Sequence, residues 1–247
     1  RNNRTRTRKQ RRTKKIINPS LKERLNVVKE KIKSAEKRSP FGNNVEIVAV
    51  TKTRPFNYIK EAYRLGIRSI GENRVHEAIE KFESFDEMPG VKKRFIGHLQ
   101  SNKTKKCISA FDTIDSIHSL KLLKKVSKEG KKAQKKMKVL LEVNTGKEIQ
   151  KKGFSPQDLD EMILCFGVEN VQIEGLMTMA PFTKNENTIR TCFSSLRNLK
   201  NKINKIIQPN CLNHLSMGMS NDYEIAIEEG ATQVRLGTVL FGERKKN

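Results

Sequence analysis

The stretch VEIVAVTK, residues 45–52, is an apolar run that ends in a lysine. Its length and its β-branched residues are typical of a buried β-strand. A strand of this kind would deliver the amine of Lys52 to a site at its carboxyl end. An amine placed there requires burial to lose its proton, because a free lysine has a pKa of about 10.4.

Seven further apolar runs follow the first, and helical patterns separate them. The eight runs span residues 45–51, 67–70, 94–97, 113–115, 138–144, 171–177, 212–216 and 233–237. Helix boundary signals lie between them, such as Asn57 before a pattern that Gly66 closes, and Ser155-Pro156 before one that Gly167 closes. Eight strand and helix pairs favour an α/β fold, a single (β/α)8 barrel of the TIM type. An open doubly wound sheet is the alternative, but no G-x-G-x-x-G follows the first run.

An additional helix is predicted before the first strand. Asn18-Pro19 precedes a helical stripe of apolar residues, namely Leu21, Leu25, Val28, Ile32 and Ala35. We therefore assign the barrel domain to residues 18–247. Residues 1–17 form a basic arm, whose first fifteen residues hold nine Lys or Arg and no acid. We interpret the arm as disordered; contact with nucleic acid or anionic lipid, or a remnant of a targeting segment, is the alternative.

The composition of the chain limits the class of protein. A chain of 247 residues with 35% hydrophobic residues is long enough for one full core, and no apolar stretch is long enough to cross a bilayer. The four cysteines form no C-x-x-C pair, which argues against a disulfide framework or a zinc site. We expect a monomeric cytoplasmic protein with no membrane partner.

Polar residues recur where the predicted strands end. In a (β/α)8 barrel the active site lies at the carboxyl ends of the strands. Taken singly, a strand-end lysine is usually a solvated residue, a histidine a satisfied loop residue, and an asparagine a helix cap. Their coincidence at six strands indicates a site, and the residues are Lys52, Asn73, His98, Asn144, Thr178 and Ser216.

Two loops near the end of the chain have the composition of a phosphate site. The stretch HLSMGMS, residues 214–220, runs from a strand into a turn of small residues, and Gly237-Thr238 leaves the eighth strand. Phosphate commonly binds in such barrels after strands seven and eight. Arg235 lies inside the eighth strand, where it forms either a salt bridge or a contact to a ring. With Lys52, these features predict a phosphate-bearing aldehyde cofactor held on the lysine.

Six motifs, in order along the chain, resemble those of the YggS/PROSC family of pyridoxal phosphate homeostasis proteins. They are VAVTKT (48–53), GEN (71–73), FIGHLQSNK (95–103), EGLMTM (174–179), SMGMSND (216–222) and VRLGT (234–238). The resemblance covers roughly Leu21 to Arg244, so the basic arm lies outside it.

The resemblance implies a fold-type III barrel, like the N-terminal domain of bacterial alanine racemase. It implies pyridoxal phosphate as an internal aldimine on Lys52, with Arg235 at the ring nitrogen and Asn73 against the cofactor. It also implies phosphate contacts from Ser216, Gly237 and Thr238. Members of the family carry and buffer the cofactor, with no established turnover, and support vitamin B6 and amino-acid balance.

We therefore expect a cofactor carrier rather than an enzyme, with pyridoxal-phosphate-dependent apo-enzymes as candidate recipients. Racemases of this fold borrow a tyrosine base from a C-terminal β domain, and here the sequence ends at Asn247, soon after the eighth run. An arginine at the ring nitrogen also weakens the electron sink. The alternatives are a one-base amino-acid racemase, a nucleic-acid-binding protein that uses the arm, and an aldolase-type Schiff-base barrel, which would not need both phosphate loops and Arg235.

Overall fold

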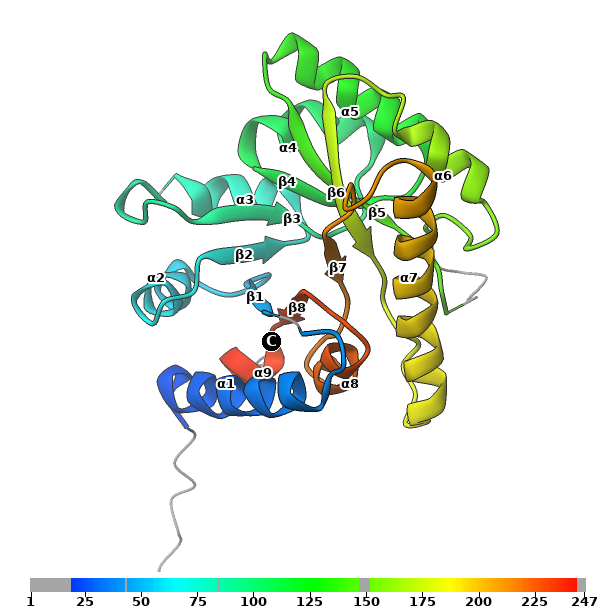
Figure 1. Ribbon diagram of the computed structural model, residues 1–247. Helices are drawn as coiled ribbons and strands as arrows, with labels where there is room; N and C mark the ends of the chain where they lie inside the picture. Colours follow the sequence, from blue (N-terminus) through cyan, green and yellow to red (C-terminus); the bar gives the residue numbers. More distant parts are fainter. Residues whose placement is uncertain (1–18, 43, 84, 147–151, 244–247) are drawn as a thin grey trace, which may run out of the picture.

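A closed barrel of eight parallel strands forms the centre of the computed structural model, which describes residues 19–42, 44–83, 85–146 and 152–243 (Figure 1). The strands are β1 (Glu46–Val50), β2 (Ser69–Glu72), β3 (Lys92–Phe95), β4 (Thr113–Ile117), β5 (Met137–Glu142), β6 (Val171–Met177), β7 (His214–Ser216) and β8 (Gln233–Leu236). Residue Val48 of β1 pairs with Ser69 of β2 on one side and with Arg235 of β8 on the other. This double pairing closes the barrel, so the predicted (β/α)8 fold is confirmed and the open sheet is excluded.

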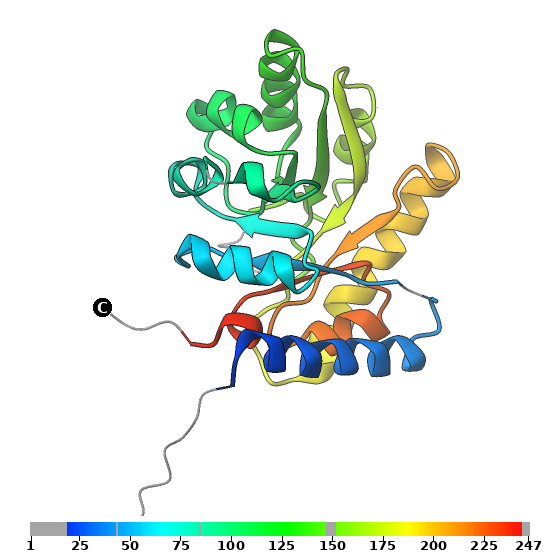
Figure 2. The ribbon, with the colours of Figure 1, turned by 90° about the vertical axis from the view of Figure 1, so that its left-hand side faces the viewer.

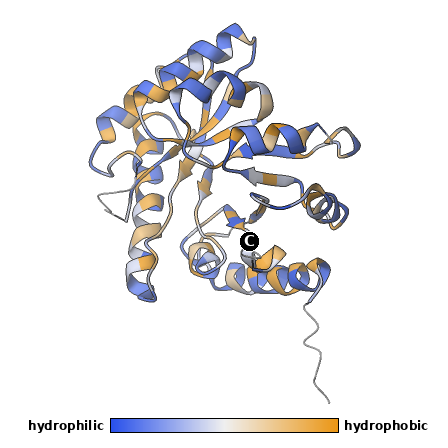
Figure 3. Ribbon diagram, turned by 180° about the vertical axis from the view of Figure 1, so that it is seen from behind, coloured by the Kyte–Doolittle hydropathy of each residue, from blue (hydrophilic) through white to orange (hydrophobic). Residues whose placement is uncertain are grey.

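Helices connect and surround the strands. They are α1 (Leu21–Arg38), α2 (Phe56–Arg64), α3 (Val75–Phe82), α4 (Thr104–Ala110), α5 (Leu120–Lys132), α6 (Leu159–Cys165), α7 (Glu186–Ile206), α8 (Tyr223–Glu228) and α9 (Thr238–Phe241), with short 3-10 turns at Phe85–Glu87 and Ser101–Lys103. Their ribbons alternate hydrophobic and hydrophilic residues, as expected for helices that cover a barrel with one face (Figure 3). None of the helices in the described ranges is long and apolar enough to cross a membrane.

The predicted N-terminal helix is confirmed as α1, which begins at Leu21 rather than directly after Pro19. Ser20 is its cap, because the Ser20 hydroxyl accepts from the Glu23 amide while the Glu23 carboxylate accepts from the Ser20 amide. The helix packs along α8 and α9 (Figure 2). It therefore braces the two elements that follow β7 and β8. The basic arm predicted over residues 1–17 lies outside the described residues.

Several predicted strand boundaries were wrong by one or two residues, because burial and ladder pairing are different properties. Ile67 is buried, but its amide donates to the Ala62 carbonyl at the end of α2, and the strand starts later, at Ser69. Leu212 is also buried, but Asn204 Oδ1 accepts from its amide at 2.8 Å. Because of such apolar residues, the strands predicted at 67–70 and 212–216 begin two residues too early.

The predicted start of the sixth helix was also wrong. Ser155 does not open it, because its hydroxyl accepts from the Gln157 amide and its own amide donates to Asp158 Oδ2. These bonds form a turn, and α6 begins after Asp158. Serine and aspartate side chains stabilise such turns as readily as helix caps, so the sequence alone did not separate the two.

The interior of the barrel is polar near the amino-terminal ends of the strands. Arg94 on β3 is 3% exposed and pairs with Glu46 of β1 at 3.1 Å and with Asp115 of β4 at 3.3 Å. It also donates to the Ser69 hydroxyl at 2.8 Å. Gln233 of β8 donates to the same Glu46 carboxylate at 2.9 Å. These bonds join five strands, β1, β2, β3, β4 and β8, far from the ends where the site was predicted, so their role is structural.

His214, at the start of β7, predicts a loss of stability on mild acidification. Burial lowers its pKa below the ordinary value of 6.5, although the nearby Glu174 raises it. The unfolded chain therefore takes up a proton as the pH falls through about 6.5, whereas the folded chain does not. We expect Tm to fall between about pH 7.5 and about pH 5.5. His214→Gln should reduce this fall; an equal fall in the variant would contradict the assignment.

Candidate functional site

A cavity of about 210 Å³ lies at the carboxyl ends of β1, β7 and β8, which are neighbours in the barrel. Lys52 comes from the turn after β1, Arg235 from β8, and the remaining polar residues from the loops that follow β7 and β8. The residues that line the cavity are Val50, Lys52, Arg54, Met219, Ser220, Asn221, Arg235, Gly237 and Thr238. Four predicted site residues, Lys52, Arg235, Gly237 and Thr238, are therefore brought together around one space.

Arg235 is a buried cation on the floor of this cavity. Its guanidinium is 4% exposed and donates to the Ser216 hydroxyl and to the Thr178 carbonyl, both at 2.8 Å. Burial lowers the pKa of Arg235, while Asp115, Asp222 and Glu142 act to raise it. Both hydrogen bonds go to neutral oxygens. Of the two alternatives left open for Arg235, these two hydrogen bonds therefore show no direct salt bridge, and the contact to a ring stays a prediction.

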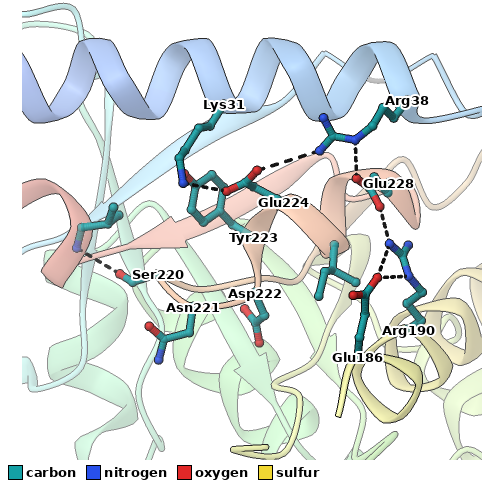
Figure 4. Close-up of a pocket in the computed structure, with 12 residues that line it drawn as sticks. Lys31, Arg38, Glu186, Arg190, Ser220, Asn221, Asp222, Tyr223, Glu224 and Glu228 are labelled. Carbon is teal, nitrogen blue, oxygen red and sulfur yellow. Dashed lines mark hydrogen bonds and ion pairs between the residues drawn. The ribbon is translucent and has the colours of Figure 1, made fainter. Parts of the chain in front are cut away.

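The loop after β7 is shaped by a glycine. Gly218 has φ of +92°, and a Cβ there would lie 2.6 Å from the Ala226 Cβ and 2.9 Å from the Tyr223 Cα. This close contact with α8 turns the chain so that Ser220 and Asn221 face the cavity. The Ser220 hydroxyl accepts from the Val239 amide at 3.2 Å, a bond that joins the loops after β7 and β8 (Figure 4).

Gly218→Ala is expected to lower the free energy of unfolding by on the order of 3 kcal/mol, through left-handed strain and overpacking together. Gly66→Ala is the matched control, because Gly66 has φ of +94° but nothing within 4 Å of its Cβ position. The control should lose only about 1 kcal/mol, from strain alone. Denaturant unfolding of both variants measures the difference, and equal losses would contradict the contact with α8.

Gly237 has no such packing requirement. Its φ of −118° suits any residue, and a Cβ would meet only Val50, at 3.5 Å. The protein's own packing therefore tolerates a side chain here, whereas a glycine leaves the backbone open toward the cavity. Glycine at such a position fits close approach of a ligand to the main chain. Together with an amine, a guanidinium and two hydroxyls, this open backbone suits a phosphorylated aldehyde.

Two predicted site residues lie outside the lining of this cavity. Ser216 is fully buried, and its hydroxyl accepts from Arg235, so it meets the site through that arginine. Asn73 follows β2 and lines a neighbouring hollow with Arg74 and His98. Its backbone is in close contact with the loop after β3, since a Cβ on Gly97 would lie 2.3 Å from the Asn73 carbonyl oxygen. Direct cofactor contacts by Ser216 and Asn73 stay predictions.

His98 and Thr178, two further strand-end residues, also lie outside the lining of the cavity. The ring of His98, after β3, lies 4.8 Å from that of His118, after β4. Lys152 Nζ lies 2.8 Å from His98 Nε2. Burial, and then Lys152, lower the pKa of His98, and burial and His98 lower that of His118. Thr178, at the end of β6, is fully buried and donates to the Val143 carbonyl at 2.7 Å.

Three polar residues of the cavity were not predicted as site residues, namely Arg54, Ser220 and Asn221, although Ser220 belongs to the turn predicted to face a phosphate. The Arg54 guanidinium donates to the Gly242 carbonyl and lies 5.9 Å from the ring centroids of both Tyr58 and Phe241. It therefore fastens the end of α9 to the loop after β1. The available signal for Ser220 and Asn221 was their place two and three residues after Gly218.

A second hollow lies behind the loop after β7, between α1, α7 and α8 (Figure 4). It shares Ser220 and Asn221 with the cavity. Arg38 of α1 and Arg190 of α7 both pair with Glu228 of α8, and Lys31 of α1 pairs with Glu224 at 3.0 Å. These ion pairs hold α8 between α1 and α7, and so support the loop from behind.

Comparison with known proteins places the chain in a family. Residues 24–245 match the family model for the alanine racemase N-terminal domain. The pyridoxal phosphate homeostasis protein of Aquifex aeolicus is 40% identical over 225 residues, which cover 90% of this chain and 98% of the relative. The chain belongs to the pyridoxal phosphate homeostasis protein family. The member from Escherichia coli is 32% identical over 227 residues, 88% of this chain and 94% of its own.

Solved structures support the same family assignment. PipY of Synechococcus elongatus, solved with pyridoxal phosphate bound, has a TM-score of 0.79 and 33% identity and covers 90% of this chain and 100% of its own. The alanine racemase of Clostridium difficile has a TM-score of 0.71 at 17% identity, with 92% of this chain and 57% of the racemase covered. The homeostasis family and the racemases therefore share the barrel fold, and the predicted family is confirmed.

Proposed function

We propose that this chain binds pyridoxal phosphate through a Schiff base on Lys52, and carries and buffers it as a cytoplasmic protein. The observation that carries the proposal is the cavity itself, where one lysine, one buried arginine and two loops of small polar residues meet in about 210 Å³. Membership of the homeostasis family supports it, as does the pyridoxal phosphate bound to the PipY relative.

Each lining residue has a separate task in this proposal. When bound, pyridoxal phosphate supplies an aldehyde carbon that condenses with the Lys52 amine, with loss of one water. Gly237 offers its open backbone to the phosphate, and Ser220 and Thr238 offer hydroxyls. Arg235 presents a guanidinium to the ring nitrogen. A guanidinium remains protonated and has no proton acceptor, so it keeps the ring nitrogen in its neutral form.

The described phenols support a carrier over a two-base racemase. No tyrosine among residues 19–42, 44–83, 85–146 and 152–243 lines the cavity. Tyr58 packs against Phe241, and the Tyr63 hydroxyl donates to the Pro89 carbonyl. Tyr223 faces the hollow behind the loop, and burial raises its pKa to about 12. The described phenols are therefore badly placed for proton abstraction at the cofactor.

A transfer assay separates the carrier from an enzyme. With the cofactor bound, an added primary amine would exchange with Lys52 at the cofactor carbon, so that Lys52 would regain its free amine and the cofactor would leave as the imine of the added amine. We expect the cofactor-loaded wild type to reactivate an apo aminotransferase more slowly than Lys52→Ala mixed with the same amount of cofactor, because only the wild type must first release the cofactor from Lys52. Solvent deuterium should enter the α-carbon of added alanine no faster than with free cofactor. Equal delivery by both proteins would count against the carrier, and rapid α-exchange would favour the racemase.

A further inference from the structure

The turn that carries Lys52 has a strained backbone. Thr53, directly after it, has φ of +62°, in the left-handed region that β-branched residues rarely adopt. Such a conformation costs on the order of 1–3 kcal/mol and persists only where surrounding contacts hold it. Contacts of Thr51 and Thr53, the neighbours of Lys52 in the chain, hold this conformation.

Lys81, near the end of α3, is the centre of these contacts. Its ammonium donates to the Thr51 carbonyl at 2.9 Å, to Glu72 Oε1 at 2.9 Å and to Glu77 Oε1 at 2.7 Å. The same Glu72 oxygen accepts from the Thr51 hydroxyl at 2.6 Å. Glu77 Oε1 also accepts from the Thr53 amide. One ammonium and two carboxylates thus bind the residues immediately before and after Lys52.

The network is shielded from solvent. The side chains of Lys81, Glu72 and Glu77 are 12%, 0% and 23% exposed. Burial raises the pKa of Glu72, although its bonds with Thr51 and Lys81 lower it. Burial also acts to raise the pKa of Glu77, but its bonds with Lys81 and Thr53 hold that pKa below the ordinary value. Charge-assisted hydrogen bonds in such surroundings are stronger than those at an open surface.

We propose that Lys81, together with Glu72 and Glu77, positions the Lys52 amine for bond formation by fixing Thr51 and Thr53. The inference rests on the proposed function, since it concerns how Lys52 meets an aldehyde. The three residues are positioning residues: they act through the backbone of the turn. Without the network, Thr53 relaxes toward ordinary backbone angles and the direction of the Lys52 side chain changes. A displacement of about 1 Å at a reacting group can cost about a hundredfold.

Lys81→Met is the principal test, and Lys135→Met is its matched control. Lys135 is also a half-buried lysine that donates to backbone carbonyls, those of Ile108 and Phe111, but it lies beside α4. Each protein is titrated with pyridoxal phosphate and reduced with borohydride, and the fraction of Lys52 that carries a pyridoxyl group is measured by peptide mapping. The pH midpoint of the imine absorption and Tm without cofactor are recorded in parallel.

The proposal expects Lys81→Met to raise the half-saturating cofactor concentration about tenfold to a hundredfold and to shift the pH midpoint. Lys135→Met should lower Tm with less than about a twofold change in cofactor binding. A folded Lys81→Met within twofold of wild type would overturn the proposal, as would an equal weakening in Lys135→Met. Absence of pyridoxyl from Lys52 in the wild type itself would instead overturn the proposed function.

A pair of variants at Glu77 keeps the test decisive if Lys81→Met does not fold. Glu77→Gln retains an acceptor for the Thr53 amide, whereas Glu77→Ala removes it. We expect the alanine variant to bind the cofactor several-fold more weakly than the glutamine variant, because only glutamine can hold Thr53 in place. Equal binding by both variants and the wild type would show that Thr53 needs no such partner, and the proposal would be wrong.

Discussion

Lys52→Ala is expected to abolish the visible imine absorption of the cofactor-loaded protein and to weaken pyridoxal phosphate binding by on the order of a hundredfold or more. The physical reason is that Lys52 is the amine lining the cavity beside Arg235, Gly237 and Thr238. Its loss leaves only non-covalent contacts with the phosphate and the ring. Absorption spectra and equilibrium dialysis with the full chain measure the two effects.

Lys105→Ala is a suitable control for Lys52→Ala, because Lys105 is an exposed lysine on α4, away from the cavity. It should bind the cofactor as the wild type does. Persistence of the imine absorption in Lys52→Ala would mean that another lysine forms the bond. In that case the assignment of the cavity as the cofactor site would be contradicted.

Thr238→Val is expected to weaken binding of pyridoxal phosphate about tenfold to a hundredfold, while binding of pyridoxal, which lacks the phosphate, changes little. A hydrogen bond to a charged group contributes about 1.5–3 kcal/mol, which corresponds to this range. Valine has nearly the shape of threonine, so the substitution removes the hydroxyl and leaves the packing of α9 in place. Comparing the two ligands on the same variant isolates the contact with the phosphate.

Ser220→Ala is expected to weaken phosphate binding more broadly, because the Ser220 hydroxyl also accepts from the Val239 amide and joins the two loops. Both effects are measured by titration of each variant with pyridoxal phosphate and with pyridoxal. Parallel losses for both ligands in Thr238→Val would contradict a phosphate role and indicate a general disturbance of the cavity.

The sequence predicted the barrel and the residues at the strand ends because these follow from local patterns. Lys52 and Arg235 each lie within or directly after an apolar run, and a closed barrel brings such positions together whatever the details of the loops. The number of strands could also be predicted from local patterns, because each strand is a separate apolar run in the sequence. The first and last residues of the strands were harder to predict from the sequence. A residue such as Ile67 is buried but does not pair with a neighbouring strand.

Loop residues were harder to predict, because the backbone path decides which side chain enters the cavity. The resemblance implies a phosphate contact by Ser216, which stays a prediction. In the structure its hydroxyl accepts from Arg235, and Ser220 lines the cavity after the turn at Gly218. The role of Lys81 had only a weak signal, its spacing of four residues from Glu77, which is common on exposed helix faces. Its burial against Glu72 depends on how α3 packs beside β2.

Borohydride reduction of the purified, cofactor-loaded protein, followed by peptide mapping, tests the central claim most directly. The account predicts a pyridoxyl group on Lys52, in the peptide that also contains Thr51 and Thr53. A folded, cofactor-exposed protein with no modification at Lys52 would contradict it, and the cavity at the ends of β1, β7 and β8 would then need another ligand.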